Sequence, residues 1–191
     1  EVFTPEIFHM IRKKMNSRGV MVSLPTYITA SPARLEANCR AYAKLVEADA
    51  KLATAFPKLH IEGPFISSVE GPRGAHPLEH AINPADAPDL MARLQDASGG
   101  RLGIITLAPE LPGAFDLIAW CRDNGIVSAA GHTNATAAEI RAGAEAGLVM
   151  STHLGNGSHQ MLPRMDNYLQ AQLAEDGLFA SFIADGHHVP F

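Results

Sequence analysis

The sequence is short of cysteine, of excess positive charge and of long apolar runs. Its two cysteines, Cys39 and Cys121, fall within helical patterns and lack the spacing of metal ligands, so a disulfide framework is not expected. The net charge of −5 gives no basic surface for nucleic acid, and no stretch approaches the roughly 20 continuous apolar residues of a membrane span. The first residues lack both a basic region and a continuous apolar run, so a secretory leader is not expected. These absences predict a cytoplasmic protein whose partner is a small molecule.

What the chain does contain is ordinary globular material. Hydrophobic residues make up 47% of the 191 positions and charged residues 18%, which is enough to build the core of one domain over residues 1–191. The first residue is Glu1 rather than a methionine. We therefore expect the sequence to begin inside a longer protein.

Apolar runs typical of strands alternate with helical patterns along the chain. Strands are predicted over residues 20–26, 59–62, 102–107, 126–130, 148–152 and 178–184. Helices are predicted over residues 5–18, 32–55, 85–96, 112–124, 135–145 and 167–175. Each predicted strand is a nearly continuous apolar run rather than an alternating one, which is typical of a parallel sheet covered by helices.

The order of these elements predicts an α/β fold of the (β/α)8 barrel type, present in part. Residues able to do chemistry gather where strands pass into loops, as they do on the C-terminal face of such a barrel. Because the chain opens on a helix and closes on a strand, it should supply strands two to seven and lack strands one and eight. An open doubly wound sheet is the alternative, but no glycine-rich phosphate loop follows the first strand.

Three side chains able to bind metal stand at the ends of predicted strands. Glu62 ends the run 59–62 and is followed by Gly-Pro, while His132 and His153 follow two later runs. The carboxyl ends of parallel strands share one rim, so these side chains are expected to converge. Imidazole and carboxylate together suit Zn²⁺ or Fe²⁺, and three protein ligands leave a position open for water. A single strand-end histidine is more often structural, but three such residues predict a divalent-metal site.

Five short segments resemble those of one enzyme family. They are HIEGPF (residues 60–65), GAH (74–76), GHTNAT (131–136), THLGN (152–156) and DGHH (185–188). Together and in this order they are similar to the N-acetylglucosamine-6-phosphate deacetylases of the amidohydrolase superfamily. The resemblance implies a metal-dependent hydrolase that converts N-acetylglucosamine 6-phosphate to glucosamine 6-phosphate and acetate. It also implies a barrel with a small β-sandwich built from both chain ends, missing here, and a homodimer when the protein is complete.

The resemblance also implies roles for individual residues. Glu62, His132 and His153 correspond to the family's metal ligands, and His76 to its substrate-facing catalytic histidine. The general acid/base aspartate would lie beyond Phe191, so the chain as given is expected to be inactive. The resemblance places five further residues at the substrate: Ala75, Asn156, Gly157, Arg164 and His188.

Several of these assignments leave alternatives open. Gly157 stands where the family has alanine, and residues 155–167 depart from the usual family sequence. Arg164 is suited to a phosphate group, since a guanidinium binds such oxyanions through two parallel hydrogen bonds, but it could equally be a solvated loop charge. Two other functions therefore stay open: hydrolysis of a different amide, and a sugar-binding barrel without catalysis.

Overall fold

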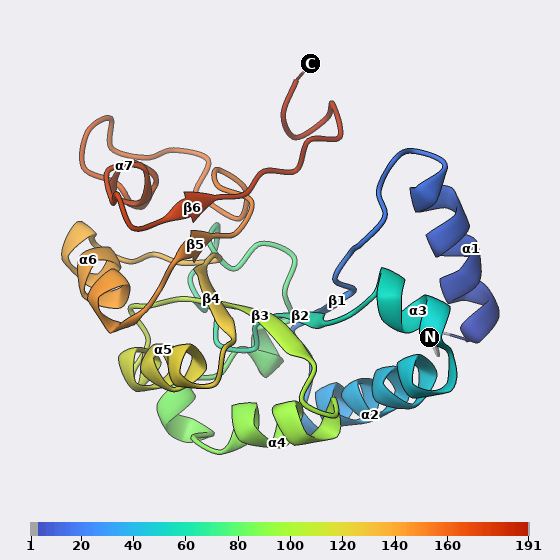
Figure 1. Cartoon of the computed structure of the whole chain (residues 1–191). Coiled ribbons are helices and arrows are strands. Elements are labelled where there is room, and N and C mark those ends of the chain that lie inside the picture. The colour runs from blue at the N-terminus through green and yellow to red at the C-terminus, as the bar shows by residue number, and fades with distance from the viewer. Residues whose placement is uncertain (1–3, 191) are drawn as a thin grey trace.

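A computed structural model describes residues 4–190 of the chain. Its centre is one curved sheet of six parallel strands, with helices along its outer side (Figure 1). The strands lie side by side in chain order, from β1 to β6. Doubly wound sheets reverse their strand order, whereas a barrel does not, so this order confirms the predicted partial barrel. The strands are β1 (Thr26–Ile28), β2 (Leu59–Glu62), β3 (Leu102–Leu107), β4 (Val127–Ala130), β5 (Met150–Ser151) and β6 (Phe179–Ala180).

The helices form the layer outside the sheet, and α2 contacts α4, α5 contacts α6, and α6 contacts α7. Their starts follow from capping side chains. Thr4 caps the first helix, with Pro5 at its first position, and Thr136 and Glu139 form a reciprocal capping box at α6. The helices are α1 (Pro5–Asn16), α2 (Pro32–Ala48), α3 (Ala50–Ala55), α4 (Leu90–Ala97), α5 (Ala114–Asp123), α6 (Ala137–Ala146) and α7 (Tyr168–Leu173), with 3-10 turns η1 (Leu78–His80) and η2 (Pro84–Asp86).

Element boundaries differ from the prediction in several places. The helix predicted over residues 85–96 begins only at Leu90, after the 3-10 turn η2. The first strand begins only at Thr26, so most of the apolar run 20–26 lies before it. The helix expected over residues 32–55 is broken at Asp49, whose extended backbone (φ −141°) ends α2 and whose carboxylate accepts from the backbone N–H groups of Lys51 and Leu52 to start α3. The last two strands have only two residues each.

The two faces of the sheet have different contents. Ile61 and Ile105 are fully buried toward the helices, where they belong to the main apolar cluster. Alternation along the strands therefore turns His60, Glu62 and Thr106 to the inner face. Two apolar side chains of the outermost strands, Ile28 and Phe179, are 53% and 79% exposed. His60, Glu62 and Thr106 thus place polar groups on the inner face, whereas the apolar core lies between the sheet and the helices.

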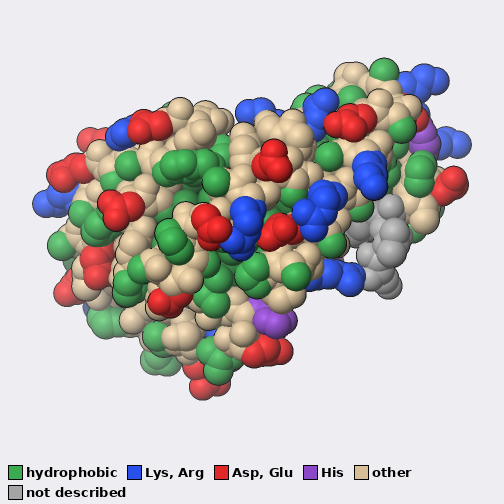
Figure 2. Space-filling model, turned by 90° about the horizontal axis from the view of Figure 1, so that it is seen from below, with side chains coloured by type: hydrophobic (Ala, Val, Ile, Leu, Met, Phe, Trp, Pro, Cys, Tyr) green, Lys and Arg blue, Asp and Glu red, His purple; other side chains and the backbone are tan. Residues whose placement is uncertain are grey.

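The outer surface shows no segregation of charge on the face seen from below. Figure 2 shows acidic and basic side chains interspersed there. Arg93 of α4 lies 3.0 Å from Glu36 of α2, so this ion pair joins the two helices at the surface, and Arg93 also lies 2.5 Å from Asp89 at the start of its own helix. Among residues 4–190, none of the helices combines the length and the apolar character that crossing a bilayer requires.

Candidate metal centre

The strand ends place the three predicted ligands at one rim of the sheet. Glu62 is the last residue of β2, and His132 and His153 follow β4 and β5 after one intervening residue each. Both histidines have positive φ, 51° for His132 and 32° for His153. This left-handed conformation is uncommon outside glycine and costs free energy, so the surrounding structure must impose it.

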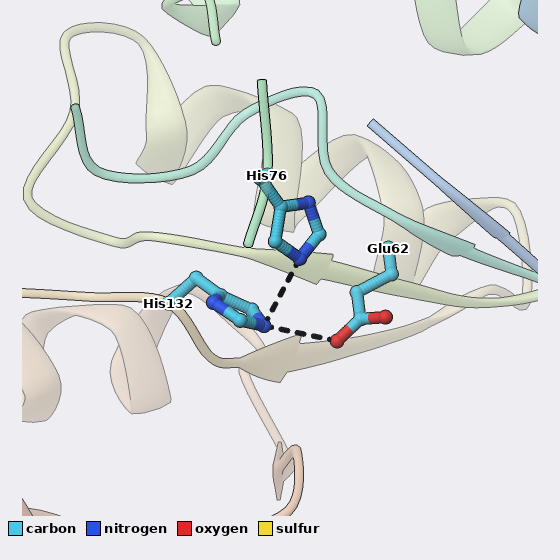
Figure 3. Close-up of side chains that lie close together, drawn as sticks. All are labelled: Glu62, His76 and His132. Atoms are coloured by element: carbon cyan, nitrogen blue, oxygen red, sulfur yellow. Dashed lines mark hydrogen bonds and ion pairs between the residues drawn. The ribbon is translucent and has the colours of Figure 1, made fainter. Parts of the chain in front are cut away.

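The donor atoms of these side chains lie within hydrogen-bond distance of one another. Glu62 Oε1 is 3.0 Å from His132 Nε2 and 2.8 Å from His153 Nε2, and the two Nε2 atoms are 3.1 Å apart. His76 Nε2 lies 3.2 Å from His132 Nε2, and Figure 3 shows Glu62, His76 and His132 pointing toward one another. The side chains of Glu62, His132 and His153 are only 12%, 6% and 13% exposed. Residues from three strand ends and one loop thus form a single cluster.

Hydrogen bonds behind the cluster determine where its protons lie. His132 Nδ1 is 2.9 Å from the carbonyl oxygen of Pro72, so it must donate there. Thr29 donates its hydroxyl to the carbonyl of Glu62, so the Nδ1 of His76, 2.8 Å from that hydroxyl, must also donate. In their neutral forms both imidazoles therefore turn an Nε2 lone pair toward the Glu62 carboxylate.

Acceptors that face one another repel, so a positive charge between them is favoured. An added proton on His132 would meet this need, and so would a divalent cation. The set of imidazole nitrogens and one carboxylate oxygen is the one that zinc and ferrous ions accept. Glu62, His76 and His132 also satisfy the spacing of a metal-binding group, with ligand atoms all within 4.8 Å of one another. The donor set therefore fits a divalent cation.

The protonation states suit metal ligands as well. Burial raises the pKa of Glu62, but the interactions with His132 and His153 outweigh it and hold the pKa below its usual range. Burial, with a smaller contribution from the charge of His132, lowers the pKa of His76 to about 4. Burial likewise lowers the pKa of His60 to about 4. At neutral pH the cluster thus contains an ionised carboxylate beside neutral imidazole, the forms in which these groups bind metal.

Some residues that support the cluster were not predicted. Glu110 accepts from the hydroxyl of Thr133 at 2.5 Å and from the backbone N–H of Asn134 at 2.7 Å, which fixes the turn that follows His132. The Ser181 hydroxyl accepts from the backbone N–H of His153 at 2.9 Å. A signal for Glu110 was available, because a carboxylate three residues after the predicted strand 102–107 lies at the same rim.

The predicted substrate residues are only partly brought together. Asn156 and His188, with His153, line a cavity of about 320 Å³. His76 is 5% exposed within the cluster, and its neighbour Ala75 is exposed. Arg164 is exposed on the loop before α7 and is not among the described residues that line this cavity.

The glycine that departs from the family sequence has a structural reason. Gly157 has φ +60°, and a Cβ atom added there would lie 2.7 Å from His132 Nδ1. Alanine at this position would be strained in its backbone and would press on the imidazole. The loop therefore passes closer to His132 than an alanine allows.

His188 is held by a turn rather than by the strand rim. Asp185 Oδ1 accepts from the backbone N–H groups of His187 and His188, and its Oδ2 is 2.9 Å from His188 Nδ1. The backbone hydrogen bond from His188 is the largest cause that lowers the pKa of Asp185 to about 2. The imidazole is thus oriented by an exposed local turn.

Comparison with known proteins agrees with this geometry. N-acetylglucosamine-6-phosphate deacetylase of Bacillus subtilis is 33% identical over 182 residues, which are 94% of this chain and 45% of that protein. A Pasteurella multocida structure with the same name matches with a TM-score of 0.82 at 26% identity, over 97% of this chain and 47% of that one. The chain matches the N-acetylglucosamine-6-phosphate deacetylases over almost its entire length. The resemblance drawn from the motifs is therefore confirmed, and the chain spans about half the length of the relatives it matches.

Two further matches have names or titles that specify a sugar phosphate. A variant from Mycobacterium smegmatis, with a TM-score of 0.78 and 29% identity over 95% of this chain and 48% of that one, was solved in complex with N-acetyl-D-glucosamine-6-phosphate. An Escherichia coli relative, 28% identical over 97% of this chain and 48% of that protein, is named N-acetylgalactosamine-6-phosphate deacetylase. No protein-family model matches the chain.

Proposed function

We propose that this chain forms the metal-binding and substrate-facing part of a cytoplasmic, homodimeric deacetylase of N-acetylglucosamine 6-phosphate. Residues 1–191 would be one incomplete barrel domain of that enzyme. The observation that carries the proposal is the convergence of Glu62 Oε1, His132 Nε2 and His153 Nε2 within 3.1 Å of one another at the rim of a parallel sheet. The similarity to named deacetylases over 94% of the chain supports the choice of reaction.

The proposed ligands are Glu62, His132 and His153, and the proposed ion is zinc or iron. When bound, such an ion supplies Lewis-acid polarisation of the amide carbonyl and makes water more acidic. The residues contribute the geometry, because the His132 imidazole donates from Nδ1 to the carbonyl of Pro72 and the backbone N–H of His153 donates to the Ser181 hydroxyl. An imidazole anchored at its second nitrogen, as that of His132 is, keeps one tautomer and one orientation, which raises metal affinity.

His76 is the proposed catalytic residue of this chain at the substrate. Its Nδ1 donates to Thr29, so the ring stays fixed while Nε2 faces the cluster. Donation from Nε2 to the amide carbonyl oxygen, as negative charge develops there, requires the other neutral tautomer, in which the proton lies on Nε2 and Nδ1 accepts from the Thr29 hydroxyl. Around the sugar we place Ala75, Asn156, Gly157 and His188. Arg164 is proposed for the phosphate, to which a guanidinium donates two parallel hydrogen bonds.

A second candidate keeps the reaction and changes the sugar. Residues 155–167 depart from the usual family sequence, and one relative is named for N-acetylgalactosamine 6-phosphate. Because this loop contains Asn156, Gly157 and Arg164, its altered path bears directly on the sugar. Hydrolysis of another amide is the broader form of this alternative.

Acetate release by the full-length protein tests both candidates. The protein should deacetylate N-acetylglucosamine 6-phosphate, lose activity on dialysis against a chelator, and regain it with one equivalent of zinc or ferrous ion. Residues 1–191 alone should show little or no turnover. Faster turnover of the galactosamine substrate would select the second candidate. Purification without metal and without hydrolysis of either sugar phosphate would contradict the proposal.

A further inference from the structure

A chain of polar side chains crosses the inner face of the sheet directly beneath the ligand cluster. His60 Nδ1 lies 3.1 Å from the hydroxyl of Thr26, and His60 Nε2 lies 2.7 Å from the hydroxyl of Thr106. The Thr106 hydroxyl is in turn 2.7 Å from that of Thr152. Thr106 and Thr152 are buried, with 0% and 7% exposure. Four side chains from different segments are thus linked in one line.

The line runs next to the predicted ligands in sequence and in register. His60 lies two residues before Glu62 on β2 and therefore on the same face of that strand. Thr106 is the register partner of Glu62 on β3. Thr152 immediately precedes His153. The hydrogen bonds therefore join the segments that carry Glu62 and His153.

The line passes over β4 because glycine follows that strand. A Cβ atom added at Gly131 would lie 2.6 Å from Thr106 Cγ2 and 3.0 Å from Thr152 Cβ. Any side chain there would push the two threonines apart. Gly131, which immediately precedes His132, thus permits a direct hydrogen bond between the β3 strand and the residue after β5.

Every group in the line has a partner. A neutral imidazole donates from one nitrogen and accepts at the other, which the Thr26 and Thr106 hydroxyls satisfy. A hydroxyl donates once and accepts twice, so Thr106 can serve His60 and Thr152 together. A fully satisfied buried network is rigid, whereas apolar residues of the same size would fill this space without fixing distances between strands.

We propose that His60 and Thr106 are positioning residues for the metal centre. Their hydrogen bonds hold the ends of β2 and β5 at the separation that brings Glu62 and His153 onto a common cation. This inference rests on the proposed function, since it assumes that the cluster binds metal. It assigns a role to residues that touch neither metal nor substrate. Metal–ligand distances tolerate only about 0.2 Å of variation, so a small change in the spacing of the strands should lower metal affinity.

The test is a set of substitutions in the full-length protein. Thr106→Val removes the hydroxyl and keeps the shape, Thr106→Ser keeps the hydroxyl, and Thr26→Val removes only the bond to Nδ1 from an exposed position. Ser128→Ala is the matched control, because Ser128 is 1% exposed and its hydroxyl bonds Gly147 on the other face of the sheet. Cobalt(II) binds in place of zinc, and its visible absorption spectrum reports ligand geometry.

Thr106→Val should weaken cobalt and zinc binding by about tenfold and shift the cobalt spectrum, as the loss of outer-shell support commonly does. Thr26→Val should act in the same direction by a few-fold. Thr106→Ser and Ser128→Ala should keep the parent spectrum and affinity. An unchanged spectrum and affinity in both valine variants would overturn the positioning role alone. Absence of metal binding by the parent protein would instead overturn the proposed function.

Discussion

The rim of the sheet and the segment after β5 present their polar residues in different ways. At the rim, the side chains of Glu62, His132 and His153 are at most 13% exposed and their donor atoms meet within 3.1 Å. After β5, Arg164 and His188 are exposed, and only His188 lines the cavity beside His153. One region is built by strand ends, and the other by turns.

This difference indicates how each region would contribute to the proposed function. Strand register fixes the ligand atoms, because a parallel ladder sets the height of each strand end relative to its neighbours. Turns such as the one at Asp185 fix a side chain only relative to its own loop. In the proposed function, the rim would therefore supply the metal ligands and the loops would supply the contacts to the sugar phosphate.

Glu62→Gln should have the largest effect, because it should remove metal binding at the rim and leave the loops unchanged. The amide has the same shape but no charge, so three neutral groups would face the cation in place of two imidazoles and a carboxylate. Metal affinity in the full-length protein should fall by more than about 100-fold, with the loss seen as metal content after gel filtration. Binding of the sugar phosphate to the metal-free protein should change little, because the loops are intact.

Glu79→Gln is the matched control, since Glu79 is an exposed carboxylate of η1. It should leave metal content at the parent value. Stoichiometric metal in the Glu62→Gln protein would show that the rim cluster is a hydrogen-bonded structural group rather than a ligand set.

Much of the fold was predictable because local patterns of apolar residues indicate strands and helices. The apolar runs at 59–62 and 102–107 became β2 and β3 with the predicted bounds. The break at Asp49 was missed, because a capping carboxylate within a long helical pattern resembles any other polar position. The shortness of β5 and β6 was missed for another reason: pairing with neighbours, which sequence does not display, decides where a strand ends.

Within the candidate site, residues at strand ends were predictable and their supports were not. Glu62, His132 and His153 follow apolar runs, so topology alone places them on one rim. Thr29 and Ser181 bond cluster residues, and Glu110 bonds the turn after His132; the partners of these hydrogen bonds are set by loop paths. Those paths depend on packing across the whole domain.

Arg164→Ala tests the loop region in the same way, because it should change substrate binding and leave metal binding unchanged. If Arg164 binds the phosphate, its loss removes charged hydrogen bonds worth about 1.5–3 kcal/mol, and kcat/KM should fall by about 10- to 100-fold. The KM for N-acetylglucosamine lacking phosphate should not change, and metal content should stay at the parent value. Arg18→Ala, at an exposed arginine after α1, is the control. Equal kinetics of the two variants would identify Arg164 as a solvated loop charge.

Glu110 tests whether the rim is rigid by itself or needs help from loops. Glu110→Ala removes both hydrogen bonds to the turn after His132, so metal affinity should fall by about tenfold while Tm of the metal-free protein changes little. Glu110→Gln keeps an oxygen for Asn134 and an N–H for Thr133, and should bind metal within about threefold of the parent. If both variants bind as the parent does, the left-handed backbone of His132 is held by strand pairing alone. The division between strand-built and loop-built regions would then be sharper than the contacts of Glu110 indicate.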